Sequence, residues 1–181
     1  MSEARQLISR FDYLSMEREN RVRHEWVGGA LFAMVGASGV HVRLTGRVFA
    51  AVLAMADAHG CRAYASDMRV MTEHVGYYPD VMVACGEQPD PYFETAPCLL
   101  VEVLSPTTRD IDQREKLAAY KAIPSLRHYL IVHQDQPRVA HHFRFDDGDW
   151  QLEIVGPIDT IELTCPPVGI PLGELFDGLV E

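Results

Sequence analysis

Two apolar runs, YPDVMV at residues 78–83 and LLVEVL at residues 99–104, decide how the middle of this chain folds. Both have the length of a strand, and each contains one acid, Asp80 in the first and Glu102 in the second. The second run is apolar on both faces except at Glu102, which predicts a central strand covered on both sides. Because a carboxylate in a buried strand is costly unless it is paired or binds a cation, the two acids are the first candidates for a functional site.

The segment after the second run is expected to be a helix. Thr107 and Asp110 form a capping pattern at its start. Pro124 ends it, because the residue before a proline avoids helical geometry. Lys116 and Tyr120 are four residues apart and therefore share one face of this helix.

Asp80 and Glu102 could converge if their strands are adjacent. At about 4 Å and an effective dielectric constant of about 20, two carboxylates repel each other by roughly 4 kcal/mol. A shared proton, a cationic side chain or a divalent cation could offset this, and oxygen ligands suit Mg²⁺ or Mn²⁺. Such a metal can orient a water molecule and stabilise charge on a phosphodiester. Lys116 could neutralise the phosphate or help to deprotonate the water.

The other segments predict a mixed sheet flanked by helices, an α/β or α+β fold. One or two helical turns are expected before residue 22. A β-hairpin should follow, with its turn at Gly28 and Gly29. Residues 40–58 have helical periodicity between an N-cap at Ser38 and a stop at Gly60. Other strands are expected over residues 22–27, 30–35, 62–71, 127–133, 138–145, 150–155 and 161–163. Residues 86–97 are expected to be a surface loop, and the tail from residue 166 to be mostly loop with one short helix near residue 175.

Composition narrows the class of protein. At 181 residues the chain is expected to form one domain, residues 1–181. No apolar run approaches the roughly 20 residues that span a membrane, and the N-terminus lacks a signal pattern, so we expect a cytoplasmic protein without a membrane partner. The net charge of −10 counts against strong non-specific binding of nucleic acid. This net charge does not exclude a local basic patch on the surface. A cluster of acids can also be a metal site.

The four cysteines, Cys61, Cys85, Cys98 and Cys165, include no Cys-x-x-Cys pair, and their spacing matches no zinc signature. We expect free thiols in a reducing compartment.

The runs YPDV at residues 78–81 and VEVLSPTTR at residues 101–109, followed by Lys116 and Tyr120, resemble a bacterial family of restriction-endonuclease-like proteins. This family was long catalogued as a domain of unknown function and belongs to the PD-(D/E)XK nuclease superfamily. The resemblance covers roughly residues 10–175. It implies a single restriction-endonuclease-like domain, with a mixed β-sheet flanked by helices and an N-terminal β-hairpin.

The resemblance also implies roles. Asp80 would be the motif aspartate and Glu102 the second metal carboxylate, while Glu25 would be the upstream acid that completes the site. The usual lysine two residues after the second acid is replaced by Leu104, and the family pattern points to Lys116 instead. The implied activity is metal-dependent endonucleolytic hydrolysis of DNA, with Mg²⁺ or Mn²⁺ as cofactor.

Each assignment has a plainer alternative. Asp80 could be an acid at a strand end or turn, and Glu102 could form a structural salt bridge. Lys116 could pair with Asp112 one helical turn back. Glu25 could be an acid on a strand surface.

Other polar residues are weaker candidates for the site. Asp67 could instead pair with Arg69 on the same strand face. His41 is expected to be a packing or capping residue more often than a site residue. His141 and His142 are adjacent and would point to opposite faces of a strand, as surface and filler residues.

Two rival functions remain. One is a nuclease-fold protein that binds nucleic acid or a protein partner without cleaving, which the acidic charge and Leu104 favour. The other is a structural subunit whose acids are merely paired. We further expect a homodimer, with residues 168–172 as interface area.

Overall fold

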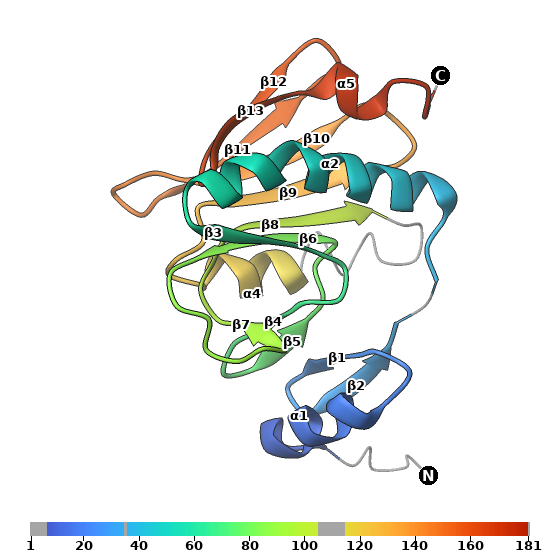
Figure 1. The fold of residues 1–181 in the computed structure, drawn as a ribbon, viewed down its shortest axis with the longest axis vertical. Helices are drawn as coiled ribbons and strands as arrows, with labels where there is room; N and C mark the ends of the chain where they lie inside the picture. The colour runs from blue at the N-terminus through green and yellow to red at the C-terminus, as the bar shows by residue number, and fades with distance from the viewer. Residues whose placement is uncertain (1–6, 35, 105–114, 181) are drawn as a thin grey trace.

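The computed structural model describes residues 7–34, 36–104 and 115–180 and is built around a six-stranded mixed sheet (Figure 1). The sheet order is β11-β10-β9-β8-β6-β3. The parallel pair is β8 and β9, and the other neighbours are antiparallel. The strands are β3 (Cys61–Ala65), β6 (Val81–Cys85), β8 (Pro97–Leu104), β9 (His128–His133), β10 (Val139–Arg144) and β11 (Trp150–Val155).

Strand β8 is the centre of this sheet, and all eight of its residues are buried. Alternate side chains enter two separate cores. Leu99 and Val101 pack toward α2 (Gly39–Ala58), whereas Leu100 and Leu104 pack toward α4 (Leu117–Lys121). This confirms the prediction of a central strand covered on both sides.

Helix α2 begins and ends where the sequence predicts. The Ser38 hydroxyl accepts a hydrogen bond from the His41 amide at 3.1 Å, and Gly60 takes a φ of +66°, which suits glycine just past a helix end. By length and composition alone this helix could cross a membrane, although the sequence analysis found no apolar run of that length. Its apolar face packs on the sheet through Leu44, Val48 and other buried residues, which accounts for its composition.

A second, five-stranded sheet has the order β2-β1-β5-β4-β7. The predicted hairpin is confirmed, with Gly28 and Gly29 at φ values of +53° and +94°. Helix α1 packs on this sheet, where Tyr13 stacks on Trp26. It runs for ten residues rather than one or two turns. The elements are α1 (Arg10–Glu19), β1 (His24–Val27), β2 (Ala30–Ala33), β4 (Arg69–Met71), β5 (Val75–Tyr77) and β7 (Phe93–Glu94).

The single strand predicted over residues 62–71 is wrong. The chain leaves β3 at Ser66, which has a φ of +63°, and continues as β4 in the other sheet. The Ser66 amide donates to the Asp80 carbonyl at 2.9 Å. The break therefore fixes the backbone directly before β6.

The loop predicted over residues 86–97 contains the short strand β7. Glu94 on this strand is buried and accepts hydrogen bonds from Arg62 Nη2 at 2.8 Å and Tyr64 OH at 2.9 Å. An ion pair between the buried Glu94 and the partly exposed Arg62 of β3 therefore holds this segment in place, and no local sequence pattern reveals it.

The C-terminal segment is a hairpin and a helix, not mostly loop. It consists of β12 (Thr160–Thr164), β13 (Pro167–Pro171) and α5 (Leu172–Phe176). Ile170 and Leu172 are 2% and 0% exposed, because they enter the α2 core. The interface predicted over residues 168–172 is therefore wrong for these two side chains.

The expectation of free thiols is also wrong, because all four cysteines form disulfides. Cys61 and Cys85 are register partners on β3 and β6, with Cα atoms 4.2 Å apart. The turn after β12 brings Cys165 to a Cα distance of 6.0 Å from Cys98. Both separations are short enough for a bridge, and neither can be read from spacing along the chain.

His141 and His142 lie on β10 and point to opposite faces, as predicted, but both are buried rather than one being at the surface. His141 contacts His128 of β9, and His142 stacks on Tyr129.

Helix α4 ends before Pro124, as predicted. The capping pattern of Thr107 and Asp110, and the alternative partner Asp112, lie outside the described residues.

Candidate active site

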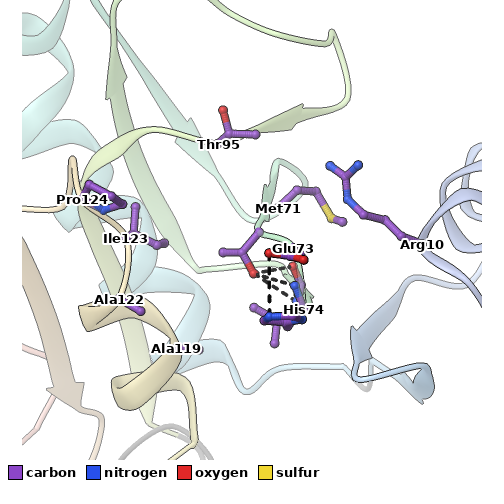
Figure 2. Close-up of a pocket in the computed structure, with 11 residues that line it drawn as sticks. Arg10, Met71, Glu73, His74, Thr95, Ala119, Ala122, Ile123 and Pro124 are labelled. Atoms are coloured by element: carbon purple, nitrogen blue, oxygen red, sulfur yellow. Dashed lines mark hydrogen bonds and ion pairs between the residues drawn. The ribbon is translucent and has the colours of Figure 1, made fainter.

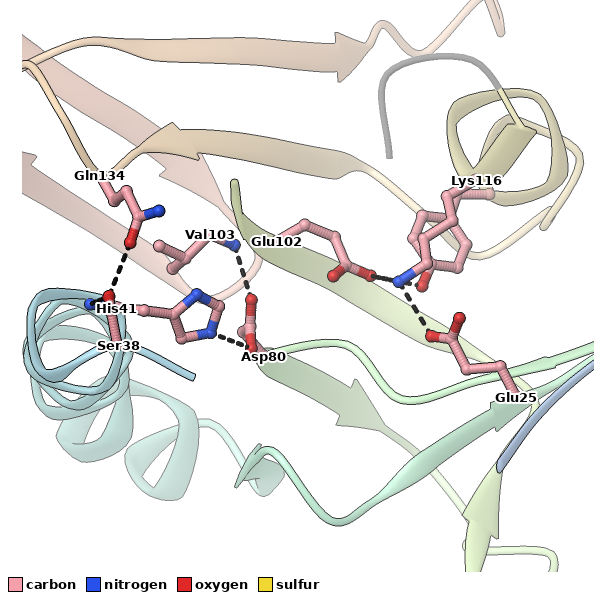
Figure 3. Close-up of polar contacts among 9 residues, drawn as sticks. Glu25, Ser38, His41, Asp80, Glu102, Val103, Lys116 and Gln134 are labelled. Atoms are coloured by element: carbon pink, nitrogen blue, oxygen red, sulfur yellow. Dashed lines mark hydrogen bonds and ion pairs between the residues drawn. The ribbon is translucent and has the colours of Figure 1, made fainter. Parts of the chain in front are cut away.

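Four of the predicted residues come from four separate segments of the chain (Figure 3). Glu25 lies on β1 and Glu102 on β8. Asp80 directly precedes β6, and Lys116 is the N-cap residue of α4. The start of α4 thus lies against the central strand, where Lys116 contacts Glu102.

Lys116 joins two of the acids. Its Nζ lies 2.9 Å from Glu25 Oε1 and 3.1 Å from Glu102 Oε1. The Lys116 and Glu102 side chains are only 6% and 5% exposed, so this contact is shielded from water. The Tyr77 ring adds a cation–π contact, with its centroid 5.3 Å from the ammonium group. The lysine predicted to replace the one absent at Leu104 therefore reaches the acids.

Tyr120, one helical turn after Lys116, fixes the same carboxylate. Its hydroxyl donates to Glu102 Oε1 at 2.8 Å. Burial, reinforced by the nearby Glu102 charge, raises the pKa of Tyr120 well above its ordinary value. The phenol therefore stays protonated and remains a donor. The predicted shared face of Lys116 and Tyr120 is confirmed by their common acceptor.

Asp80 is held by a different set of groups. Its Oδ2 accepts from the Val103 amide at 2.7 Å, and its Oδ1 lies 2.8 Å from His41 Nε2. The Val103 contact ties Asp80 to the residue next to Glu102. Asp80 lies just before β6 rather than within the strand, where the sequence predicted it. The two acids are linked through adjacent residues of β8 and have separate hydrogen-bond partners.

His41, a weaker candidate in the sequence, contacts the candidate site residue Asp80. The ring lies in the first turn of α2, and its side chain is 14% exposed. Ser38 caps this turn and also donates to Gln134 Oε1 at 2.8 Å, which anchors the helix start beside the end of β9. The contact joins residues 39 positions apart, so only the fold reveals it.

Comparison with known proteins identifies the family. The family model described as "Uma2: Putative restriction endonuclease" matches residues 11–172. The chain belongs to the Uma2 family. This confirms the resemblance to restriction-endonuclease-like proteins that the sequence motifs indicated.

Two uncharacterized proteins of Synechocystis sp. are similar to this Uma2 protein. One is 31% identical over 176 residues, which is 95% of this chain and 93% of the relative. The other is 32% identical over 168 residues, which is 87% and 93% of the two chains.

A solved structure has the same fold. The crystal structure of "a putative nuclease belonging to DUF820" from Anabaena variabilis aligns with a TM-score of 0.77 and 15% identity, covering 95% of this chain and 99% of that one. The predicted fold, a restriction-endonuclease-like mixed sheet flanked by helices, is confirmed.

Asp67 lies away from the site of this Uma2 protein. Its side chain is 81% exposed, and its ion-pair partner is Arg23, at 3.8 Å. Arg69, the alternative partner, is buried and stacks on Tyr13 and Tyr78. Asp67 is therefore an exposed acid outside the candidate site.

The donor types of the three acids suit a hard divalent cation, but in this structure their oxygens do not all lie within 4.8 Å of one another, so binding one ion through all three would need their side chains to move together. Glu25, Asp80 and Glu102 supply carboxylate oxygens, the ligand type that Mg²⁺ and Mn²⁺ prefer. Among the described residues, the Lys116 ammonium contacts two of these three carboxylates. Glu25 and Asp80 are 17% and 18% exposed, so a cation can reach them from solvent above the buried Glu102.

A separate cavity of about 600 Å³ lies between α1, the turn before β5 and the far side of α4 (Figure 2). Its walls include Met71, Ala119 and Ile123, with Arg10 and Glu73 as charged groups. The helix thus presents Lys116 and Tyr120 to Glu102, and Ala119 to the cavity. The cavity is therefore separate from Glu25, Asp80 and Glu102, which we call the acid cluster.

Proposed function

We propose that this protein is a metal-dependent endonuclease that hydrolyses phosphodiester bonds in DNA. The observation that carries the proposal is the Lys116 ammonium held between Glu25 and Glu102, with Asp80 bonded to the backbone amide of Val103, the residue after Glu102. Membership of the Uma2 family and the nuclease-like fold support a nuclease. The metal and the choice of DNA are inferred from the chemistry of the acid cluster and from the family description.

In this proposal Asp80 and Glu102 would hold Mg²⁺ or Mn²⁺, with Glu25 assisting. Such a metal, when bound, polarises a phosphoryl oxygen and lowers the pKa of a water molecule. Tyr120 and the Val103 amide orient the two acids. Lys116 stabilises negative charge that develops on the phosphate, because its ammonium group is fixed in a site shielded from water.

The alternative is a nuclease-fold protein that binds nucleic acid without cutting it. Leu104, at the position of the usual lysine, is 1% exposed and lies in the apolar core on the α4 side. The net charge of −10 also disfavours tight contact with DNA. The two functions differ in one measurable result. A nuclease cleaves DNA, whereas the alternative protein binds DNA and leaves it intact.

The test is conversion of supercoiled plasmid in Mn²⁺, set beside DNA binding measured in EDTA. The wild type should nick and linearise the plasmid, and Asp80→Ala should not. Asp67→Ala removes an exposed acid outside the cluster and should cleave like the wild type. Binding in EDTA together with an intact plasmid in Mn²⁺ would establish the alternative.

Metal binding itself makes a second prediction. At a Mn²⁺ concentration about ten times Kd, binding should stabilise the wild type by roughly 1.4 kcal/mol. For a chain of this size that corresponds to a rise in Tm of about 3–6 °C. Glu102→Gln keeps the shape of the side chain but loses its charge, and should respond much less. Equal shifts in calorimetry for the wild type and Glu102→Gln would refute the assignment of Glu102.

We further propose that the protein is a homodimer joined through β11. Within the described part of the chain, this strand has a neighbour on one side only. Its Leu152 and Ile154 side chains are 56% and 47% exposed. An open edge with apolar side chains can pair with a second copy. Antiparallel pairing centred on Leu152 would place Gln151 opposite Glu153 of the other copy, so no like charges meet.

Light scattering after size exclusion should therefore report twice the chain mass at high micromolar concentration. Leu152→Lys should shift the protein toward monomer, because a two-fold pairing would set the introduced charges against each other. Phe11→Lys changes another exposed apolar residue, at 77% exposure, and should leave the mass unchanged. A monomeric wild type would rule the interface out.

A further inference from the structure

Four cysteine sulfurs converge at the end of the main sheet away from the acid cluster. Cys61 begins β3, Cys85 ends β6 and Cys98 is the second residue of β8, whereas Glu102 and Val103 lie near the other end of β8. Cys165 lies in the turn between β12 and β13. The four thus come from four separate segments of the fold.

The sulfurs form one cluster rather than two isolated disulfides. The bonds join Cys61 to Cys85 and Cys98 to Cys165. Across the two bonds, Cys85 Sγ lies 3.8 Å from Cys98 Sγ and 3.5 Å from Cys165 Sγ. The sulfurs of Cys61, Cys85 and Cys165 all lie within 4.8 Å of one another.

We propose that, once these disulfides are reduced, the four cysteines bind one Zn²⁺ as a structural tetrathiolate site. A Zn–S bond length of about 2.3 Å in a tetrahedron sets neighbouring sulfurs roughly 3.8 Å apart. The Cys85–Cys98 contact already has this separation, and the Cys85–Cys165 contact is 0.3 Å shorter, at 3.5 Å. Opening the two S–S bonds would let the bonded sulfurs separate toward the same distance.

The backbone around the cluster is held by the sheet, so binding requires little folding. Cys61 and Cys85 are register partners, and Cys98 lies on β8, which pairs with β6. Cys165 is placed by the hairpin of β12 and β13, whose Ile161 and Leu163 pack into the α2 core. Because the ligands come from four distant segments, no pair has the short spacing by which zinc sites are recognised in a sequence.

Burial favours the metal over four free thiolates. Cys61 and Cys98 are 8% and 6% exposed, and Cys85 and Cys165 are half-buried. Clustered thiolates without a cation would repel each other and lose hydration, whereas Zn²⁺ compensates their charge. The half-buried pair leaves a side through which an ion can enter.

The reduction is balanced by a dithiol reductant. Each Sγ–Sγ bond takes up two electrons and two protons from one dithiol, which is itself oxidised to a disulfide. Two such steps give four thiols. Zn²⁺ then binds as the thiol protons are released to solvent, so that uptake rises with pH.

A bound zinc ion would cross-link β6 and β8, the two strands that lead to the candidate active site. Cys85 lies on the strand that follows Asp80, and Cys98 lies on the strand that contains Glu102. A zinc ion would join β3, β6, β8 and the C-terminal hairpin at one point. This cross-link would hold in a reducing compartment, where disulfides are lost.

The test uses the full chain reduced with a dithiol, freed of metal with a chelator and exchanged into anaerobic buffer. We expect one tightly bound zinc per chain by elemental analysis after addition of Zn²⁺. Co²⁺ used as a probe should give sulfur-to-cobalt charge-transfer absorption and the visible bands of tetrahedral Co²⁺, which carboxylate ligands do not produce. Zn²⁺ should also protect all four thiols from alkylation, a readout that needs no variant.

Cys85→Ser should lose stoichiometric zinc and the sulfur-to-cobalt bands. The matched control is Glu102→Gln, which alters the acid cluster and should keep both. Reduced wild type that binds no zinc, or whose four thiols are alkylated equally fast with and without Zn²⁺, would overturn the proposal. So would a Co²⁺ spectrum without sulfur bands, or full zinc retention in Cys85→Ser.

Discussion

Lys116→Ala is expected to lower plasmid cleavage about 10²–10³-fold, the size of the loss when one fixed stabiliser of transition-state charge is removed. The ammonium lies within 3.1 Å of two carboxylates and is nearly buried, so water cannot take its place without loss. Lys116→Arg should recover only part of the activity. A guanidinium is broader than an ammonium and does not readily lose a proton.

The measurement is the rate of plasmid nicking in saturating Mn²⁺, with melting curves recorded for each variant. Mn²⁺ should still raise the Tm of Lys116→Ala, because its three carboxylates are intact. Lys121→Ala is the matched control, since this lysine lies on the same helix but contacts the Trp150 ring. Cleavage by Lys116→Ala at the wild-type rate would eliminate this mechanism even if the protein proves to be a nuclease.

The parts of the fold that could be predicted have local causes. The central strand β8 is recognisable because its apolar run occupies both faces. Helix α2 has its own start and stop signals at Ser38 and Gly60. The β1–β2 hairpin is specified by two consecutive glycines with positive φ.

The parts that were wrong depend on tertiary contacts. The predicted strand over residues 62–71 divides at Ser66, whose amide binds the carbonyl of Asp80. Strand β13 is bounded by Pro167 and Pro171, so it has the composition of a loop, and its pairing with β12 supplies the order. Propensity is a weak guide wherever a neighbouring element decides the conformation.

The candidate site divides in the same way. Glu25, Asp80, Glu102 and Lys116 could be selected from motifs, and the structure brings Lys116 into contact with two of these acids. His41 lies 39 residues before Asp80 and carries no motif of its own. The sequence indicated only that His41 lies in the first turn of a capped helix after the hairpin. That position alone does not reveal that its partner is Asp80.

Two other histidines that the sequence does not mark as partners form a buried pair. The Thr164 amide donates to His128 Nε2 at 2.9 Å, so this nitrogen is an acceptor and the neutral ring carries its proton on Nδ1. That proton is then donated to His141 Nε2 at 2.9 Å. His141 Nδ1 lies 4.0 Å from the exposed Glu153 carboxylate. The arrangement suits two neutral rings, and an added proton would break it.

Acid should therefore destabilise the protein through this pair. Burial, followed by the neighbouring His141 and Arg127, lowers the pKa of His128 to about 3. Burial and the neighbouring His142 lower the pKa of His141 to about 4. The unfolded chain takes up protons near pH 6.5, whereas the folded protein resists until pH 3–4. The stability that the neutral pair contributes is complete above pH 6.5 and is lost as the pH falls below it.

Linkage gives a loss on the order of 2–4 kcal/mol for the pair between pH 7 and pH 5. Urea unfolding at the two pH values measures it. His141→Gln offers a side-chain oxygen that can accept from His128 without titrating, so the drop should shrink by about 2 kcal/mol, the share of one histidine. His142, whose pKa burial also lowers to about 4, still contributes to the drop that remains. His74→Gln changes a histidine whose side chain is 81% exposed and should show the wild-type drop. Equal pH dependence in His141→Gln and wild type would mean that the buried pair does not set the acid stability of this fold.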